Sequence, residues 1–278
     1  MAGSILGNRV VRVEDPKLLT AGGTYVYDLH LTGEIEGALH GVFVRSIVAH
    51  ALIDGIDTSE AAGAPGVVAV LTAADLGVEA HHGFIKVADE FARSPLASDR
   101  VRYVGDMIAL VVAETFEQAV DAAELVVVDY QPLAPVVDPE HAFDDGIEPI
   151  FPNKGDNIAL AVTDPDTDVL AGADHVVRGR YINQRVAGVP MEPNSCAAVP
   201  GGSSGSESDT GEKLLTFYGA NQMPHVLRDQ LAVALGLEPD DVRVVTPDVG
   251  GGFGAKAGLC HENSAVAAAA LALGRPVT

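Results

Sequence analysis

The stretch Met107–Tyr130, MIALVVAETFEQAVDAAELVVVDY, holds two apolar runs separated by an amphipathic segment. The first run, 107–113, is uninterrupted and of strand length, which is typical of a strand buried on both faces. Thr115 is followed three residues later by Gln118, a capping-box pattern, and apolar residues then recur at helical spacing. The second apolar run, 125–130, predicts another strand. The stretch therefore predicts a strand, a helix and a strand in that order.

Short apolar runs also precede the stretch 107–130. Residues 38–44 and 67–71 predict two strands, and Gly66 breaks the chain before the second of them. Between these runs, residues 58–62 have the composition of a helical turn, with Thr58 as its cap. Strands that alternate with helices indicate an α/β (α+β) fold class.

After residue 135 the composition of the sequence changes. Residues 136–168 are rich in proline, aspartate and glycine, which is typical of a connection between domains. An alternating stretch, 175–183, opens a second block. In that block residues 196–199 and 214–218 are strand candidates, and the Gly/Ser-rich segment 201–212 between them predicts a solvent-exposed hairpin loop.

The remaining sequence predicts a helix, a strand, a glycine-rich turn and a second helix. Pro224–Leu235 is the first helix and Gly236 its C-cap, because proline favours the first helical position and glycine the position after the last. Residues 240–246 predict the strand, and the alanine-rich residues 261–273 the second helix. The last four residues, 275–278, resemble the beginning of another strand. A strand start alone leaves its pairing groups unmatched, so we expect a truncated domain.

Composition limits the class of protein. The chain has 278 residues with 17 basic and 39 acidic side chains, a formal net charge of −22. Such a charge repels phosphate backbones and anionic lipid, which argues against nucleic-acid and membrane-surface binding. No apolar run approaches the ~20 residues that a bilayer span needs. Two cysteines provide no disulfide framework, and the first residues lack the apolar core of a secretory signal. We therefore expect a cytoplasmic protein.

The stretch Val249–Lys256, VGGGFGAK, is the first candidate for chemistry. Its glycines permit positive φ angles and close approach of the backbone to a ligand, and its amides could hold an anion. A Walker A loop is excluded because Ala257 follows Lys256. Gly252 and Gly254 match a dinucleotide fingerprint loosely, which leaves a nicotinamide-binding enzyme as an alternative. A tight turn that only packs is the other alternative.

Gln222, in the stretch 218–225 (YGANQMPH), is the second candidate. Its amide could face a ligand or satisfy neighbouring backbone groups, and the residues alone favour the latter. Glu192 lies in the rigid turn 190–193 (PMEP), where a lone glutamate is usually structural. His225, at a helix start, has the position of a capping or surface residue.

Together these stretches resemble the large, molybdenum-binding subunit of the molybdenum hydroxylases, the family of xanthine dehydrogenase, aldehyde oxidase and aerobic carbon monoxide dehydrogenase. Residues 7–28 look like the family's N-terminal entry segment, and 56–76 and 101–137 resemble its α/β hammerhead domain. The opening of its molybdopterin-binding domain is similar to residues 183–193, 219–225 and 247–256. The resemblance covers almost the whole chain and keeps the family's order.

The resemblance implies a division of the chain into four parts. Residues 1–20 would be the entry segment and 21–135 the α/β hammerhead domain. Residues 136–168 would be a linker, and 169–278 the first, truncated part of the molybdopterin-binding domain.

The resemblance also implies site residues. It assigns Gln222 to hydrogen bonding at the molybdenum centre. The backbone of the turn approaches the metal ligands, with the amide of Phe253 nearest. The turn residues implied as cofactor-binding are Gly251, Gly252, Phe253 and Gly254. No residue of this chain is implied as a metal ligand or as catalytic, because the family's catalytic base lies beyond the position of Thr278.

The implied activity is that of a molybdenum-dependent oxidoreductase. It would oxidise an aldehyde, carbon monoxide or an N-heterocycle with water as the oxygen source. Family members that oxidise purines have a glutamate at the position of Ala257, so strong selection of purines is not expected. These 278 residues alone would be inactive. A truncated, non-catalytic relic, or a split subunit that contributes only an interface, is the alternative.

Cofactors and partners follow from the same resemblance. The chain would bind molybdenum–molybdopterin in its cytosine dinucleotide form. Electrons would pass to iron–sulfur (2Fe–2S) clusters in a small subunit and FAD in a medium subunit. The complete assembly would be a dimer of heterotrimers, with no nucleic-acid partner and no membrane span.

Overall fold

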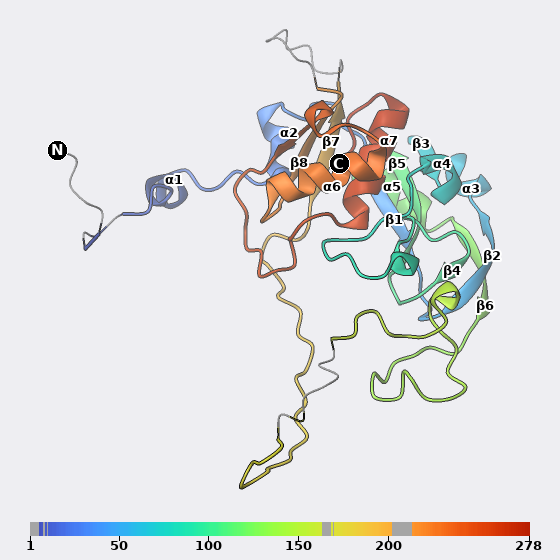
Figure 1. Ribbon diagram of the computed structural model, residues 1–278. Helices are drawn as coiled ribbons and strands as arrows, with labels where there is room; N and C mark the ends of the chain where they lie inside the picture. Colours follow the sequence, from blue (N-terminus) through green and yellow to red (C-terminus); the bar gives the residue numbers. More distant parts are fainter. Residues whose placement is uncertain (1–5, 8, 10, 163–167, 169, 202–212) are drawn as a thin grey trace.

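The computed structural model describes the chain except for residues 1–5, 8, 10, 163–167, 169 and 202–212 (Figure 1). The strands are β1 (His40–Arg45), β2 (Ala51–Asp57), β3 (Val67–Leu71), β4 (Arg100–Val101), β5 (Met107–Ala113), β6 (Val127–Pro132), β7 (Cys196–Pro200), β8 (Leu215–Gly219) and β9 (Val242–Val245). The α-helices are α1 (Asp15–Thr20), α2 (Leu29–Thr32), α3 (Ser59–Ala62), α4 (Ala73–Leu76), α5 (Phe116–Ala123), α6 (Pro224–Leu235) and α7 (His261–Leu273). Short 3-10 helices cover Val26–Asp28, Asp89–Phe91, Pro152–Lys154 and Pro239–Asp241.

The strands form three-stranded sheets that mix with helices, which confirms the predicted fold class. Two sheets, ordered β1-β5-β3 and β4-β2-β6, are antiparallel throughout. The third is ordered β7-β8-β9, with β8 antiparallel to β7 and parallel to β9. Every residue of β5 is buried, and α5 packs on its sheet. The burial of every residue explains why the sequence of β5 is continuously apolar.

The last residues of the chain link two of the sheets. Val277 pairs with Leu39 beside β1 and with Ala198 of β7. The amide of Leu39 donates to the Pro276 carbonyl at 2.8 Å, and the amide of Ala198 donates to the Val277 carbonyl at 2.8 Å. Residues 275–278 were expected to begin a strand, and Val277 does pair as one. Through this pairing the β7 sheet is continued by the β1 sheet.

One hydrophobic core joins the two halves of the chain. It joins Leu110 of β5, Phe217 of β8, Leu231 of α6 and Ala267 of α7, all of them fully buried. The core therefore fixes α6 and α7, which flank the candidate site, against the first half of the molecule. Figure 1 shows these two helices beside the β7–β8 strands and close to β1 and β5.

Several elements have the bounds that the sequence predicts. The strands β3 and β5 and the helices α6 and α7 begin and end at the expected residues. The capping box before α5 is present, since the Gln118 amide donates to Oγ1 of Thr115 and the Thr115 amide donates to Oε1 of Gln118. Helix α6 ends at Gly236, whose φ of 66° makes it a left-handed C-cap.

Other local expectations were wrong or incomplete. The Thr58 side chain makes no capping hydrogen bond at α3. Asp57 caps this turn instead, because its Oδ1 accepts from the Ser59 amide at 2.9 Å and the Ser59 hydroxyl at 2.6 Å. Strands β2 and β4 were not predicted. Strand β9 starts at Val242 rather than at residue 240, because residues 239–241 form a 3-10 turn.

The stretch before β7 does not form a strand. Residues 175–183 alternate in sequence, but they are exposed and pair with no described strand. Figure 1 shows this part of the chain running away from the body of the molecule. The predicted loop 201–212 lies almost entirely outside the described residues, although β7 and β8 are antiparallel neighbours, as a hairpin requires.

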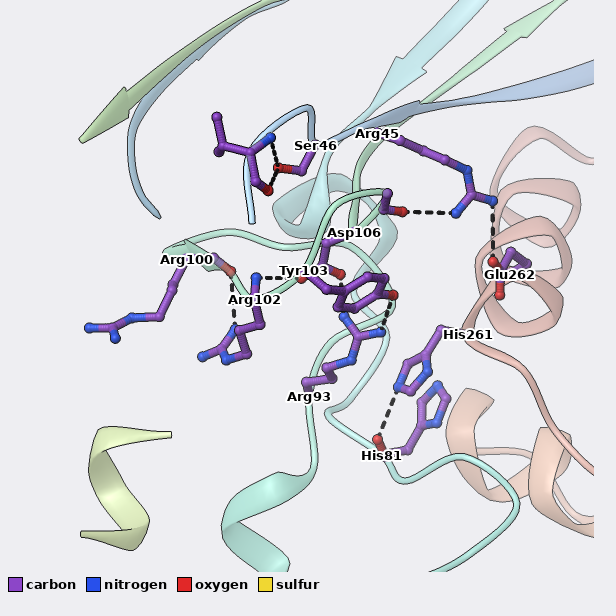
Figure 2. A network of polar contacts seen from close by, with 12 residues as sticks. Arg45, Ser46, His81, Arg93, Arg100, Arg102, Tyr103, Asp106, His261 and Glu262 are labelled. Carbon is purple, nitrogen blue, oxygen red and sulfur yellow. Dashed lines mark hydrogen bonds and ion pairs between the residues drawn. The ribbon is translucent and has the colours of Figure 1, made fainter. Parts of the chain in front are cut away.

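A polar network holds the first turn of α7 against the first half of the chain (Figure 2). The rings of His81 and His261 stack with centroids 4.4 Å apart, and a ring nitrogen of His81 lies 2.8 Å from the Ser264 hydroxyl. Arg45 of β1 lies 3.2 Å from the carboxylate of Glu262. These contacts hold the start of α7, the helix that follows the glycine-rich turn.

Candidate functional site

The glycine-rich turn lies between β9 and α7 and has an unusual backbone. Gly251, Phe253 and Gly254 have φ angles of 101°, 52° and 81°. Phe253 is one of only two non-glycine residues with positive φ in the described part of the chain. A non-glycine residue in this region carries backbone strain, which persists only where the surroundings impose it and which often marks functional sites.

Gln222 lies between β8 and α6 and touches the turn with both its backbone and its side chain. Its amide donates to the Lys256 carbonyl at 2.8 Å, and its Oε1 accepts from the Gly254 amide at 3.0 Å. A Cβ placed on Gly252 would lie 2.4 Å from Cδ of Gln222. Only glycine therefore fits at residue 252 while Gln222 keeps this position. The interpretation that Gln222 satisfies a nearby backbone group is correct for Oε1, whereas its exposed amide nitrogen has no partner within the described structure.

The turn offers three backbone donors. Among the described residues, no acceptor lies within hydrogen-bond reach of the N–H groups of Gly251, Gly252 and Phe253. The donors on either side are used, since Gly250 donates to Glu192 and Gly254 to Gln222. Consecutive free amides at a glycine turn form a concave site for anionic or oxygen-rich groups.

Phe253 closes one side of the turn. A Cβ on Gly251 would lie 2.8 Å from Cε2 of Phe253 and 3.3 Å from Cβ of Pro190, so the ring lies over the turn and beside the 188–190 segment. The Phe253 side chain is nevertheless 74% exposed. The exposed ring therefore lies next to Gly251, the first residue with a free amide.

Three further polar residues support this arrangement and were not predicted as site residues. Asn221 is buried, donates through Nδ2 to the Gly258 carbonyl at 2.8 Å, and accepts at Oδ1 from the Met223 amide at 2.7 Å. Glu192 and Lys256 form an ion pair of 2.8 Å between Oε2 and Nζ. The rigid turn around Glu192 and the lysine at the end of the glycine motif were the available signals.

The segment 17–25 also contacts the residues at the start of the turn. The carboxylate of Asp248 accepts from the ammonium of Lys17 and, at 2.8 Å, from the Thr24 amide. These hydrogen bonds, that of Lys17 foremost, lower the pKa of Asp248. Tyr25 lies beside Gly250, where an added Cβ would be 3.4 Å from its ring. The segment around residue 24 is thus hydrogen-bonded to Asp248, which lies between β9 and the turn.

The two cysteines have no nucleophilic character. Burial raises the pKa of Cys196 to about 12 and that of Cys260 to about 11. Both thiols therefore stay protonated near neutral pH, and a thiol is a poor nucleophile compared with its thiolate. A structural role for Cys260 agrees with this environment.

The structure brings all five predicted site residues together in one place. Gln222 contacts Gly252 and Gly254 directly, and Phe253 packs on Gly251. The arrangement can donate hydrogen bonds from backbone and side-chain amides to one ligand. Within the described structure, no group of three or more His, Cys, Asp or Glu side chains could hold a metal ion directly.

Two family models of known proteins match the chain. Residues 20–134 match the family model of the aldehyde oxidase and xanthine dehydrogenase α/β hammerhead domain, and residues 150–278 match the molybdopterin cofactor-binding domain. The nicotine 6-hydroxylase large subunit of Paenarthrobacter nicotinovorans is 37% identical over 99% of this chain and 33% of its own length. The carbon monoxide dehydrogenase large chain of Afipia carboxidovorans is 35% identical over 98% of this chain and 34% of its own.

Solved structures agree. The quinoline 2-oxidoreductase of Pseudomonas putida 86 matches with a TM-score of 0.83 and 33% identity, over 98% of this chain and 34% of that one. The chain thus has the fold of a hammerhead domain and the start of a molybdopterin-binding domain, about a third of a molybdenum hydroxylase large subunit. It belongs to the aldehyde oxidase and xanthine dehydrogenase family, whose members are oxidoreductases, and it spans about a third of the length of the curated relatives it matches.

Proposed function

We propose that Gln222 and the turn residues Gly251, Gly252, Phe253 and Gly254 hold the molybdenum–molybdopterin cofactor of an oxidoreductase large subunit. The observation that carries this proposal is the set of free amides at residues 251–253 beside the Gln222 side chain. Gly252 supports it, because a Cβ there would displace Gln222. The residues present therefore fit a cofactor rich in oxygen and sulfur acceptors.

In this proposal each residue has a simple physical role. The amides of residues 251–253 donate to acceptor atoms of the cofactor, with that of Phe253 nearest, and the Gln222 amide nitrogen donates from the side. When bound, the cofactor would accept the electrons removed from the substrate. The catalytic base is expected outside these residues.

The proposed reaction is oxidation of an aldehyde, carbon monoxide or an N-heterocycle, with water as the oxygen source. The names of the relatives support this range, since they include a nicotine hydroxylase, a carbon monoxide dehydrogenase and a quinoline oxidoreductase. Ala257 argues against purines, because its methyl group offers no hydrogen bond to a purine ring.

The proposed assembly includes partner subunits. Relatives are described as large subunits or as a subunit of a dehydrogenase complex. We propose an iron–sulfur (2Fe–2S) small subunit and an FAD-binding medium subunit in a dimer of heterotrimers, with the cytosine dinucleotide form of the cofactor. Within the described residues no helix is long and apolar enough to cross a membrane. The proposed compartment is the cytoplasm, where the two free cysteines would stay reduced.

The proposed parts of the chain are an entry segment (1–20), a hammerhead domain (21–135), a linker (136–168) and the opening of the molybdopterin-binding domain (169–278). The matched ranges 20–134 and 150–278 support the first two boundaries more closely than the third.

Elemental analysis of the complete native gene product tests the proposal. We expect about one molybdenum per chain in the wild type, because a single turn of this kind holds a single cofactor. In Gln222→Ala the molybdenum content should fall while the thermal midpoint stays unchanged. A wild-type protein that contains no molybdenum when its partner subunits are co-produced would refute the function.

A further inference from the structure

Glu192 and Lys256 form a deeply buried ion pair, and Lys256 is the last residue of the glycine turn. The Lys256 side chain is fully buried and that of Glu192 is 10% exposed. Burying two charges is costly even when they are paired, and replacement of such a pair by apolar residues often stabilises a protein. Stability alone therefore gives a weak reason for this pair.

The pair connects the two ends of the turn. Oε2 of Glu192 accepts from Nζ of Lys256 at 2.8 Å and from the Gly250 amide at 2.8 Å. The Glu192 amide in turn donates to the Gly250 carbonyl at 3.2 Å. One carboxylate oxygen thus holds both the first and the last residue of 250–256, although it belongs to a segment about sixty residues away in sequence.

Lys256 extends this connection to Gln222. The Lys256 carbonyl accepts from the Gln222 amide, and the Gln222 side chain accepts from the Gly254 amide. The strained residue Phe253, with φ of 52°, directly precedes Gly254. Inside the turn the described bonding is limited to one contact, from the Ala255 amide to the Gly252 carbonyl. The turn therefore depends on groups outside itself to keep its shape.

The other carboxylate oxygen is unused. Oε1 of Glu192 is buried and has no hydrogen-bond partner among the described atoms. An unsatisfied buried acceptor is costly, so a glutamate here is a poor choice for packing. The unpaired Oε1 therefore agrees with a role for Glu192 in positioning the turn.

We infer that Glu192 and Lys256 are positioning residues that hold the 250–256 turn, and through it Gln222, in the geometry that presents the free amides of residues 251–253. They act through the turn, because the described hydrogen bonds of their charged groups are to each other and to the Gly250 amide. The inference deepens the proposed function, since the turn is the proposed cofactor site. Its test nevertheless does not need the cofactor.

The test is amide hydrogen exchange in the complete native gene product, with the double variant Glu192→Gln, Lys256→Met. The double variant leaves no uncompensated buried charge, whereas either single variant would, and could unfold for that reason alone. We expect exchange at the Gly254 and Gln222 amides to become roughly tenfold faster or more, as for a lost charge-assisted hydrogen bond. Exchange in α7 should not change.

A matched control removes an exposed pair. Lys86 and Asp89 lie 3.1 Å apart with side chains that are both mostly exposed, so Lys86→Met, Asp89→Asn should leave exchange in the turn unchanged. The inference is overturned if the Glu192/Lys256 double variant exchanges like the wild type at Gly254 and Gln222. It is also overturned if exchange in α7 rises by the same factor, because the pair would then only stabilise the whole fold.

Molybdenum content in the same preparations separates this inference from the proposed function. If the wild type holds molybdenum, the double variant should hold less at an unchanged thermal midpoint, and equal contents would contradict a positioning role. If the wild type holds none, the proposed function fails. Faster local exchange in the turn would then still establish that the pair sets its shape.

Discussion

The Gln222 side chain packs so closely against Gly252 that a residue larger than glycine does not fit at position 252. A Cβ on Gly252 would lie 2.4 Å from Cδ and 2.6 Å from Oε1 of Gln222. Gly252 itself does not have a positive φ, so alanine suits its backbone. The effect of a substitution should therefore fall on Gln222 and not on the fold.

We predict that Gly252→Ala lowers the molybdenum content of the complete gene product about tenfold, because Gln222 must give up its bond to Gly254. Elemental analysis measures this directly. The control is Gly63→Ala, where the added Cβ meets its nearest atom at an ordinary 3.7 Å. Wild-type molybdenum in Gly252→Ala would show that the position of Gln222 does not matter.

His261 should make stability depend on pH. Burial lowers its pKa to about 4, and repulsion by Arg93 and His81 adds to this. The unfolded chain, with a histidine pKa near 6.5, binds the proton more tightly. The contribution of neutral His261 is therefore complete above about pH 6.5 and is lost as the pH falls towards 4. It amounts to at most roughly 3 kcal/mol.

Urea unfolding of the wild type and of His261→Gln at about pH 7 and about pH 4.5 measures this effect. Carboxylates titrate equally in both proteins, so the difference between them reports on His261. We expect the wild type to lose more free energy of unfolding on acidification than the variant. Parallel losses would mean that His261 does not titrate in the folded protein in this range.

At this scale the sequence predicts part of the site. The glycine motif and the 218–225 stretch are contiguous and recognisable, so Gln222 and residues 251–254 could be proposed from the printed chain. The pair of Glu192 with Lys256 could not, because it is a contact between segments far apart in sequence. No spacing rule links these positions, and a lone glutamate between prolines looks structural.

Among the elements, α5 offers a clear test of helix capping. The Thr115 hydroxyl accepts from the Gln118 amide, whereas the Thr58 hydroxyl makes no such bond at α3. We predict that Thr115→Ala lowers the free energy of unfolding by about 1 kcal/mol, as expected for a lost N-cap. Thr58→Ala, the same substitution at a cap position without the bond, should have little effect. Equal losses in urea denaturation would contradict the assignment.

The accuracy of the element predictions follows their physical basis. Helices α6 and α7 and strands β3 and β5 were predicted with their bounds because apolar periodicity and glycine or proline boundaries are local signals. Strand β2, with the sequence ALIDGID, lacks clean alternation and owes its strand form to its neighbours β4 and β6. Residues 175–183 show the converse, since they alternate but have no described partner strand.

In the whole molecule, Val277 connects two sheets that lie far apart in sequence. It is fully buried between Leu39 and Ala198. We predict that Val277→Ala lowers the free energy of unfolding by about 2 kcal/mol, the transfer and cavity cost of its two methyl groups. Val68→Ala on β3, where valine is 40% exposed, should cost clearly less. Chemical denaturation of both variants gives the comparison, and equal costs would show that this joint does not stabilise the fold.

We propose that the glycine turn and Gln222 hold a molybdenum cofactor. Anomalous diffraction at the molybdenum absorption edge, from crystals of the complete native gene product, would locate the metal. We expect an anomalous peak beside the Gln222 side chain and the amides of residues 251–253. A peak at another site, or a molybdenum-containing protein with no peak next to this turn, would show that the turn does not hold the cofactor.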